Sequence, residues 1–422
     1  MQKDWRPAMA RKPMNIDLMR KVDYFAGIPL CFLATWFTRL ADLLGGAKPQ
    51  PPEKVLFIEL SEMGSAILAD PAMRKLQAAT GATLYFLIFK SNAASLRLLG
   101  TVPQARVFTI RADSFLNLTL DSLRFLFWAR REGIDTVIDL ELFSRYSALL
   151  TGLSGAARRI GFHAFHNEGL YRGAMLTRRV AYNPHVHIAK NFVALVNATL
   201  AEKPELPFSK TRIDDSEIQL ARAPVDTEAI AAMRGRVREA YPAYDAARHR
   251  IVLINPNASD LLPQRRWMPE RFAAVMRSLL AEHPEVLILI TGAPGERAAA
   301  AALQKQAADA RCVNFAGCHG LDELPALYQI AELMLTNDSG PGHFSAVTGL
   351  RTFVLFGPET PALYGSLGNS TPIYAGLACS PCVSATNHRK TPCRDNVCLQ
   401  AISVETVLAQ LRPALADGGA KP

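Results

Sequence analysis

Short, almost continuous apolar runs alternate with amphipathic stretches over most of the chain. In the first half, the runs that predict strands cover residues 54–60, 83–89, 105–110, 136–140 and 159–162. The amphipathic stretches predict helices at residues 65–79, 115–133 and 185–200. Apolar strands that alternate with helices are typical of a parallel sheet that is covered on both faces.

The alternation stops in the polar, proline-containing residues 201–248 and then starts again. Strands are predicted at residues 250–255, 286–291, 312–315, 333–336 and 352–356, with helices at 269–282, 295–308, 321–331 and 342–348. We therefore predict an α/β protein with two tandem Rossmann-like domains, at residues 51–205 and 249–422, joined by a linker at 206–248. Ligands of such sheets bind at the carboxyl ends of the strands, so the cleft between the domains is the expected site.

Residues 1–50 form a further part, with a basic arm and an apolar segment. The first 21 residues contain six basic and two acidic side chains, and the apolar run covers residues 24–37. This run is shorter than the roughly 20 residues that a helix needs to cross a bilayer. Three interpretations stay open: an interfacial helix or re-entrant hairpin on anionic lipid, a buried accessory helix, and a spanning segment. In either membrane interpretation the basic side lies in the cytoplasm.

Composition and charge narrow the class of protein. The 422 residues are 49% hydrophobic and 20% charged, which excludes a disordered chain and allows large buried cores. The net charge of +9 suits an anionic partner. Basic and aromatic side chains do not form a dense common stripe, so nucleic acid is not the expected partner.

Cysteine usage bears on the compartment. The chain has seven cysteines, an odd number, and no convincing secretory signal. We expect a reducing, cytoplasmic compartment, with the protein peripheral at the inner face of the cytoplasmic membrane. Four cysteines cluster within twenty residues, at Cys379, Cys382, Cys393 and Cys398. A structural zinc ion, a disulfide and plain reduced thiols are the alternatives for this cluster.

Polar loops follow three strands of the second predicted sheet. The loop at residues 336–343 (TNDSGPGH) opens a helix, whose N-terminus and backbone N–H groups suit a phosphate. The loop at 255–267 carries arginines that suit phosphate oxygens, and the loop at 291–297 carries a glutamate that suits ribose hydroxyls. The alternatives are a turn without a ligand, a solvated basic loop and a glutamate that only suits the helix dipole. The predicted nucleotide-sugar-binding residues are Asn257, Arg265, Arg266, Glu296, Asp338, Ser339, Gly340 and His343.

Several motifs of other nucleotide-dependent enzymes are missing from the sequence. It has no Walker A motif, no GxSxG elbow and no Asp-x-Asp pair that would hold a metal and a diphosphate. We therefore expect arginines and helix dipoles to neutralise the diphosphate, with no cofactor required for catalysis. A nucleotide-sugar epimerase is disfavoured, because the dinucleotide fingerprint and a Tyr-x-x-x-Lys pair are both missing.

Five segments resemble glycosyltransferase family 9, the heptosyltransferases of lipopolysaccharide core assembly. They are residues 61–71 (SEMGSAILADP), 255–267, 292–297, 337–343 and 356–361 (FGPETP), and the resemblance covers residues 54–412. It implies two Rossmann-like domains in a GT-B arrangement. It also implies metal-independent, inverting transfer of a sugar from a nucleotide sugar, usually ADP-heptose, to a lipid-linked saccharide. In the family pattern, Arg265 or Arg266 takes the diphosphate-binding place, Glu296 the ribose-binding place and Asp338 a place at the sugar or diphosphate. Ser339, Gly340 and His343 fall on the diphosphate loop.

The first loop departs from the family pattern. The family's proposed general base is an Asp directly after Gly64, where this chain has Ser65, and Glu59 replaces a basic residue. Because a serine cannot act as a base unaided, another carboxylate is needed in an active enzyme. Our order of candidates is Glu62, then Glu59, then Asp139. The alternative is a catalytically altered protein that binds nucleotide sugars, or serves as a scaffold, at the membrane.

The acceptor is expected at the polar stretch that follows the last strand of the first domain. In the family this region faces the acceptor, which implies acceptor-binding roles for His163 and Arg172. Arg158 and Arg159 are further candidates for holding a phosphorylated saccharide. An ordinary surface loop is the alternative.

Overall fold

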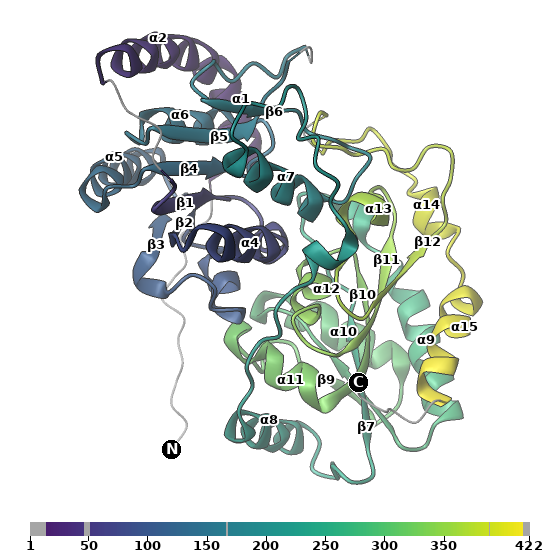
Figure 1. The fold of residues 1–422 in the computed structure, drawn as a ribbon. Coiled ribbons are helices and arrows are strands. Elements are labelled where there is room, and N and C mark those ends of the chain that lie inside the picture. The colour runs from purple at the N-terminus through teal and green to yellow at the C-terminus, as the bar shows by residue number, and fades with distance from the viewer. Residues whose placement is uncertain (1–13, 46–50, 166–167, 388, 417–422) are drawn as a thin grey trace.

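The computed structural model describes residues 14–45, 51–165, 168–387 and 389–416 (Figure 1). They form two parallel sheets of six strands each, in the orders β3-β2-β1-β4-β5-β6 and β12-β11-β10-β7-β8-β9. Each sheet starts at an inner strand and extends first to one side and then to the other. The predicted pair of Rossmann-like domains is confirmed.

The first sheet is buried on both faces. Its strands are β1 (Lys54–Ile58), β2 (Thr83–Phe89), β3 (Val107–Ile110), β4 (Thr136–Asp139), β5 (Arg158–Phe162) and β6 (Arg178–Val180). Alternate residues of β1 point to opposite faces, as the period of a strand requires. Val55 and Phe57 pack with α4 (Asp70–Thr80) and α7 (Ile188–Leu200). Leu56 and Ile58 pack with α5 (Phe115–Glu132) and α6 (Arg145–Leu153).

The second sheet repeats this arrangement. Its strands are β7 (Arg250–Asn255), β8 (Val286–Ile290), β9 (Cys312–Asn314), β10 (Ala331–Asn337), β11 (Arg351–Phe356) and β12 (Ser370–Tyr374). One face packs with α9 (Pro269–Glu282), α10 (Arg297–Ala307) and α15 (Val404–Ala416). The other packs with α8 (Thr227–Ala240), α11 (Leu324–Ile330) and α12 (Gly340–Ser345). Short helices α13 (Pro361–Tyr364) and α14 (Val397–Gln400) lie in the C-terminal segment.

Some elements differ from the sequence-based prediction for identifiable reasons. The helix expected at residues 65–79 is divided into α3 (Met63–Leu68) and α4, because Pro71 belongs to the first turn of a new helix. β12 was not predicted, since it contains Pro372, which a strand tolerates at the edge of a sheet. α8 was also missed, because its short apolar stripe lies within a polar segment.

The N-terminal apolar segment forms two helices, α1 (Ile16–Phe25) and α2 (Gly27–Gly45). Pro29 lies in the first turn of α2, where proline is tolerated, so the apolar helix is longer than the predicted run. Within α2, the stretch Gly27–Leu44 has a mean hydropathy of 1.3 and is long and apolar enough to cross a membrane; 28% of it is buried. The buried side chains Cys31, Ala34, Thr35 and Thr38 lie on one face, and α2 packs against α6.

A cavity of about 2810 Å³ lies between the two domains. It is lined by the loops that follow β1 and β4 of the first sheet and β7, β8 and β10 of the second. The strand order reverses between β1 and β4 in the first sheet and between β7 and β10 in the second, and crevices form at such points in doubly wound sheets. The cleft expected from the sequence is therefore present.

Candidate active site

The loop between β1 and α3 is held by a buried carboxylate. Glu141 Oε1 accepts hydrogen bonds from Leu60 N at 2.8 Å, Ser61 N at 3.0 Å and Ser61 Oγ at 2.9 Å. Burial raises the pKa of Glu141, and these donors counteract that effect. Glu141 therefore fixes the backbone that carries Glu62 and Ser65 into the cavity.

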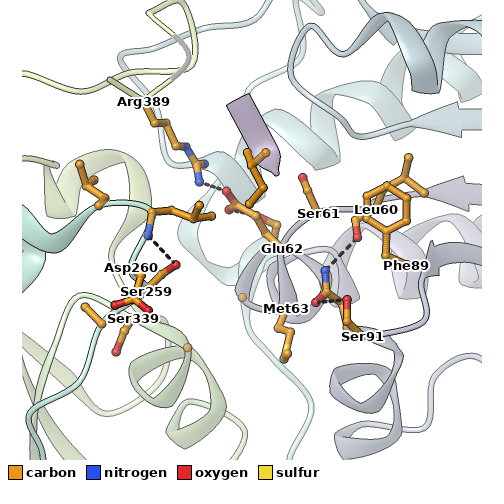
Figure 2. Close-up of a pocket in the computed structure, with 18 of the residues that line it drawn as sticks. Leu60, Ser61, Glu62, Met63, Phe89, Ser91, Ser259, Asp260, Ser339 and Arg389 are labelled. Carbon is orange, nitrogen blue, oxygen red and sulfur yellow. Dashed lines mark hydrogen bonds and ion pairs between the residues drawn. The ribbon is translucent and has the colours of Figure 1, made fainter. Parts of the chain in front are cut away.

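Glu62 and Ser65 are hydrogen-bonded to each other. Ser65 Oγ donates to Glu62 Oε2 at 3.0 Å, so the carboxylate of Glu62 lies directly beside the Ser65 side chain. Both residues line the cavity. Figure 2 shows Glu62 between Arg389 and the pair Leu60 and Phe89. The carboxylate of Glu62 is thus adjacent to Ser65, the residue that directly follows Gly64.

An arginine from the C-terminal segment contacts Glu62 from the second domain. Arg389 forms an ion pair with Glu62, and its guanidinium lies 4.9 Å from the ring centroid of Tyr364. Its Nε is 3.8 Å from Glu359 Oε1. Burial lowers the pKa of Arg389 to about 10, against the effect of the nearby Glu59 carboxylate. Burial also raises the pKa of Glu59 well above its usual value, and Glu141 adds to this effect.

The second domain contributes another buried group of charges. Arg265 Nη2 lies 2.5 Å from Glu359 Oε1, and Arg265 Nε lies 3.3 Å from Asp338 Oδ2. Burial raises the pKa of Glu359 to about 7 and also raises that of Asp338, while Arg265 counteracts both shifts. Carboxylates and arginines therefore alternate across the cleft, in the order Glu62, Arg389, Glu359, Arg265 and Asp338.

The loop after β10 reaches across the cleft. A Cβ atom on Gly64 would stand 2.5 Å from His343 Cδ2, so the imidazole packs directly on the first domain's loop. Burial, with further contributions from His187 and Arg265, lowers the pKa of His343 to about 3. At neutral pH this side chain is therefore an uncharged hydrogen-bonding group. Ser339 and Gly340 line the cavity where α12 begins.

The side chains of Asn257 and Glu296 both lie next to Gly292. A Cβ atom there would lie 2.7 Å from Asn257 Nδ2 and 2.9 Å from Glu296 Oε2. Glu296 Oε2 accepts a hydrogen bond from Ala293 N at 2.6 Å, a local helix-start contact that leaves its other oxygen for a ligand. Arg266 donates to Ala258 O at 3.0 Å through Nε, and its side chain is 41% exposed.

The cavity brings together most of the residues that the sequence predicted. Those that line it are Glu62, Ser65, Asn257, Arg265, Arg266, Glu296, Asp338, Ser339, Gly340 and His343. Glu59, the second candidate for the base, lines it as well. Their roles toward a ligand stay predictions.

Asp139 and Arg172 require a correction. Neither is among the residues that line the cavity. Asp139 is fully buried, accepts a hydrogen bond from Ser147 Oγ at 3.0 Å and forms an ion pair with Arg172. Arg172 also donates to Phe162 O at 3.0 Å and to Ser144 O at 2.9 Å. The pair stabilises the interior of the first domain, so the structure does not place either side chain at the cavity, where the sequence-based prediction expected them.

The other predicted acceptor residues also lie away from the cavity. His163 does not line it, and burial lowers the pKa of this side chain to about 4. Arg159 is buried, and its guanidinium contacts Asp42, Met175 O and Ala156 O. His163 and Arg159 are thus not at the cavity, and an acceptor-binding role of these side chains stays a prediction.

The four clustered cysteines are free thiols. Neighbouring thiols contribute to the raised pKa of Cys398, after burial, so the cysteines lie near one another. Cys393 Sγ contacts Asp395 Oδ1 at 3.2 Å, and Cys398 Sγ contacts Asn396 Oδ1 at 3.5 Å. Among the described residues, no group of three or more His, Cys, Asp or Glu side chains is arranged to hold a metal ion. A zinc site stays a prediction.

Three charged residues of the site were not predicted as site residues. Glu359 lies inside the FGPETP segment, which was a usable signal. Glu141 directly follows the strand predicted at residues 136–140, and its location at the sheet's carboxyl edge was a weaker signal. Arg389 comes from a loop with no regular pattern, so only the three-dimensional structure reveals its contact with Glu62.

Comparisons with known proteins agree on one family. The model of glycosyltransferase family 9 (heptosyltransferase) matches residues 128–391. A lipooligosaccharide heptosyltransferase 2 from Campylobacter jejuni is 27% identical over 169 residues, which are 39% of this chain and 51% of that protein. The chain thus spans about half the length of the curated relatives it matches.

Solved structures show the same fold. ADP-heptose lipopolysaccharide heptosyltransferase II of E. coli aligns with a TM-score of 0.65 at 18% identity, covering 87% of this chain and all of that one. The E. coli heptosyltransferase WaaC, solved with ADP, aligns with a TM-score of 0.59 at 16% identity, covering 86% and 99% of the two chains.

Proposed function

The chain belongs to glycosyltransferase family 9, and from this premise we propose that it is a glycosyltransferase of lipopolysaccharide biosynthesis. The proposed donor is a nucleotide sugar, ADP-heptose, and the proposed acceptor is a lipopolysaccharide-type or lipid-linked saccharide. Transfer inverts the anomeric centre and needs no divalent metal. The relatives' names support the donor, since one E. coli structure is a heptosyltransferase with ADP.

The second domain is proposed to hold the donor. Asn257 and Glu296 face the nucleoside, and Arg266 and the start of α12 face the diphosphate. Arg266 is the more accessible arginine, because Arg265 already pairs with Asp338 and Glu359 inside the cavity wall. Arg265 adds positive charge from inside the cavity wall, without touching the diphosphate. The neutral His343 donates a hydrogen bond to a phosphate oxygen.

The observation that carries the proposal is the hydrogen bond between Ser65 and Glu62. It puts a carboxylate beside the position where the family's base is expected. We propose that Glu62 takes the proton from the acceptor hydroxyl as the acceptor oxygen attacks the anomeric carbon. The bond from that carbon to the diphosphate breaks on the opposite side, and ADP leaves with the electron pair. The ion pair with Arg389 holds the Glu62 carboxylate in this part of the cavity.

The protein is proposed to lie at the inner face of the cytoplasmic membrane. α2 exposes an apolar face opposite its contact with α6, formed by Phe32, Leu33, Trp36, Phe37, Leu40 and Leu43. α5 exposes a second stripe at helical spacing, formed by Leu116, Leu120, Leu123 and Phe127. Both helices contact α6, so the stripes belong to neighbouring parts of the first domain (Figure 1). Apolar surface of this extent suits a lipid interface.

The alternative is a membrane-bound nucleotide-sugar-binding protein without transfer activity. Two observations at Ser65 and Glu62 favour this alternative. Ser65 cannot act as a base, and Glu62 forms an ion pair with Arg389. An ionic partner stabilises the charged carboxylate and makes it a weaker proton acceptor.

Donor turnover separates the two functions. ADP-heptose is incubated with the protein and a membrane glycolipid fraction in the presence of EDTA, and heptose incorporation and ADP release are measured. We expect both to occur. Tight ADP-heptose binding without transfer to any acceptor would support the alternative, and an absolute need for a divalent metal would contradict the proposed mechanism.

A further inference from the structure

Helix α1 lines the cavity and contacts the first domain near both of its ends, while its Asp17 pairs with Lys390 of the second domain at 3.2 Å. Near its start, Met14 N donates to Ala112 O at 3.5 Å. Near its end, Asp23 accepts a hydrogen bond from Tyr146 N at 2.8 Å and pairs with Arg145 at 3.3 Å. The helix therefore bridges the loop after β3 and the start of α6. None of its ten residues, all described, is buried.

The face of α1 toward the cavity carries two apolar side chains that are not packed into a core, beside the charged Arg20 and Asp23. Ile16 and Met19 are half-buried and line the cavity, yet in the described part of the chain they belong to no hydrophobic core cluster. The same cavity is also lined by Phe89, Leu118 and Tyr146, and Tyr146 adjoins the end of α1 through its hydrogen bond to Asp23. These side chains and those of Ile16 and Met19 give the part of the cavity at α1, here called the hollow, an apolar lining.

This hollow is continuous with the reaction site. The same cavity is lined by Glu62 and by the nucleotide-binding loops of the second domain. It also reaches Phe25 and Leu30 at the joint of α1 and α2, whose side chains are 74% and 49% exposed. One part of the cavity therefore holds the reacting groups, and another opens beside the apolar face of α2. Figure 2 shows Phe89 and Leu60 on the far side of Glu62 from Arg389.

We propose that the hollow beneath α1 binds the hydrocarbon chain of the acceptor lipid, while its saccharide lies at Glu62. This assignment rests on the proposed function and names the part of the acceptor that the enzyme recognises. Apolar walls favour a hydrocarbon occupant over water, since burying such a chain removes apolar surface from water on both sides. Arg20, which lines the same cavity from α1 and pairs loosely with Asp17 at 3.6 Å, supplies a cation for an anionic headgroup.

The first test measures chain binding without turnover. The probe is cis-parinaric acid, a fluorescent 18-carbon fatty acid, titrated below its micelle concentration into the full-length protein. Met19→Trp places a larger side chain in the hollow from α1, and Leu118→Trp does so from α5. Leu200→Trp makes the same kind of change at an exposed site at the end of α7 and is the matched control.

We expect the two filling variants to bind the probe about tenfold more weakly, the loss from about two unburied methylene groups. Leu200→Trp should bind it like the wild type, and all variants should keep the wild-type thermal shift with ADP. Equal probe affinity in all four proteins, or an equal loss in the control, would overturn the proposal.

The second test separates the acceptor's own chain from a bilayer lipid. Each variant is assayed with the membrane glycolipid acceptor and with the same acceptor after removal of its hydrocarbon chains. The filling variants should raise KM for the intact acceptor and leave KM for the chain-free acceptor unchanged. An equal effect on both acceptors would overturn the assignment. If the wild type transfers to neither acceptor, the proposed function fails, while the probe titration still decides the hollow.

Discussion

His343 packs directly on Gly64, across the cleft between the two domains. The distance of 2.5 Å from a Cβ at position 64 to His343 Cδ2 leaves no room for a side chain. The contact joins the loop that carries Glu62 to the loop proposed to hold the diphosphate. The spacing of donor and base therefore depends on a glycine in the first domain.

Gly64→Ala should impair transfer more than folding. The methyl group must push His343 away or separate the domains, and such overpacking costs about 1–3 kcal/mol. We expect kcat to fall about tenfold or more, because small misplacement of reacting groups is costly. Circular dichroism should stay unchanged. Gly235→Ala, at an open position in α8, is the control and should have wild-type activity.

Glu62→Gln tests the proposed base. The amide preserves the size of the side chain and can still accept the hydrogen bond from Ser65, but it takes no proton from the acceptor. We expect kcat to fall by about 10²–10⁴-fold with nearly unchanged ADP-heptose affinity. Full activity of the variant would exclude Glu62. Higher activity of Ser65→Asp than of the wild type would favour a native protein that has drifted toward binding.

Replacing Arg265 should lower stability, whereas replacing Arg266 should weaken ADP binding. Arg265→Ala leaves the buried Glu359 and Asp338 carboxylates without their cation, so we expect the unfolding free energy to fall by about 3–5 kcal/mol. Arg266→Ala removes a partly exposed side chain and should change stability little. Its expected effect is about tenfold weaker ADP binding, the loss of one charge-assisted contact. Denaturant unfolding and calorimetry measure the two effects, and identical behaviour of both variants would contradict this division.

The sequence predicts the sheets well because their strands are buried on both faces. The strand at residues 250–255 was predicted with its observed bounds, since six consecutive residues with four apolar ones admit few other structures. The loops of the second domain were found because parallel strands gather their carboxyl ends at one edge.

The sequence pattern does not predict which way a side chain points or which residues far away in the sequence it contacts. Asp139 lies at the end of a strand, as a cleft residue should, yet Arg172 turns it into the interior through a contact 33 residues away. Arg389 reaches Glu62 from the other domain, and no periodic pattern marks it. The sequence predicts the helix at residues 115–133, but only the packed structure shows which of its apolar side chains stay exposed.

Membrane attachment should depend on α5 as well as on the N-terminal helices. A double variant, Leu123→Glu with Phe127→Glu, puts two charges into the exposed stripe. We expect about tenfold weaker binding, or more, to vesicles of phosphatidylethanolamine and phosphatidylglycerol, because burial of two large apolar side chains is lost. Ala231→Glu with Ala232→Glu, exposed on α8, makes the same charge change as a control. Unchanged vesicle binding in the α5 variant would exclude this helix from the interface.

The low pKa of His343 predicts a pH-dependent cost to stability. Its imidazole has a pKa of about 3 in the folded protein and about 6.5 in an unfolded chain, so between these values the unfolded state binds more protons. The wild type therefore loses stability from this residue as the pH falls from about 6.5 toward 3. His343→Gln removes the titrating group, so its unfolding free energy relative to the wild type should rise at pH 5 compared with pH 7.5. Denaturant titrations at both pH values measure this, with the exposed His185→Gln as the control. A relative free energy that is the same at both pH values would mean that the imidazole is charged as readily in the folded protein as in the unfolded chain.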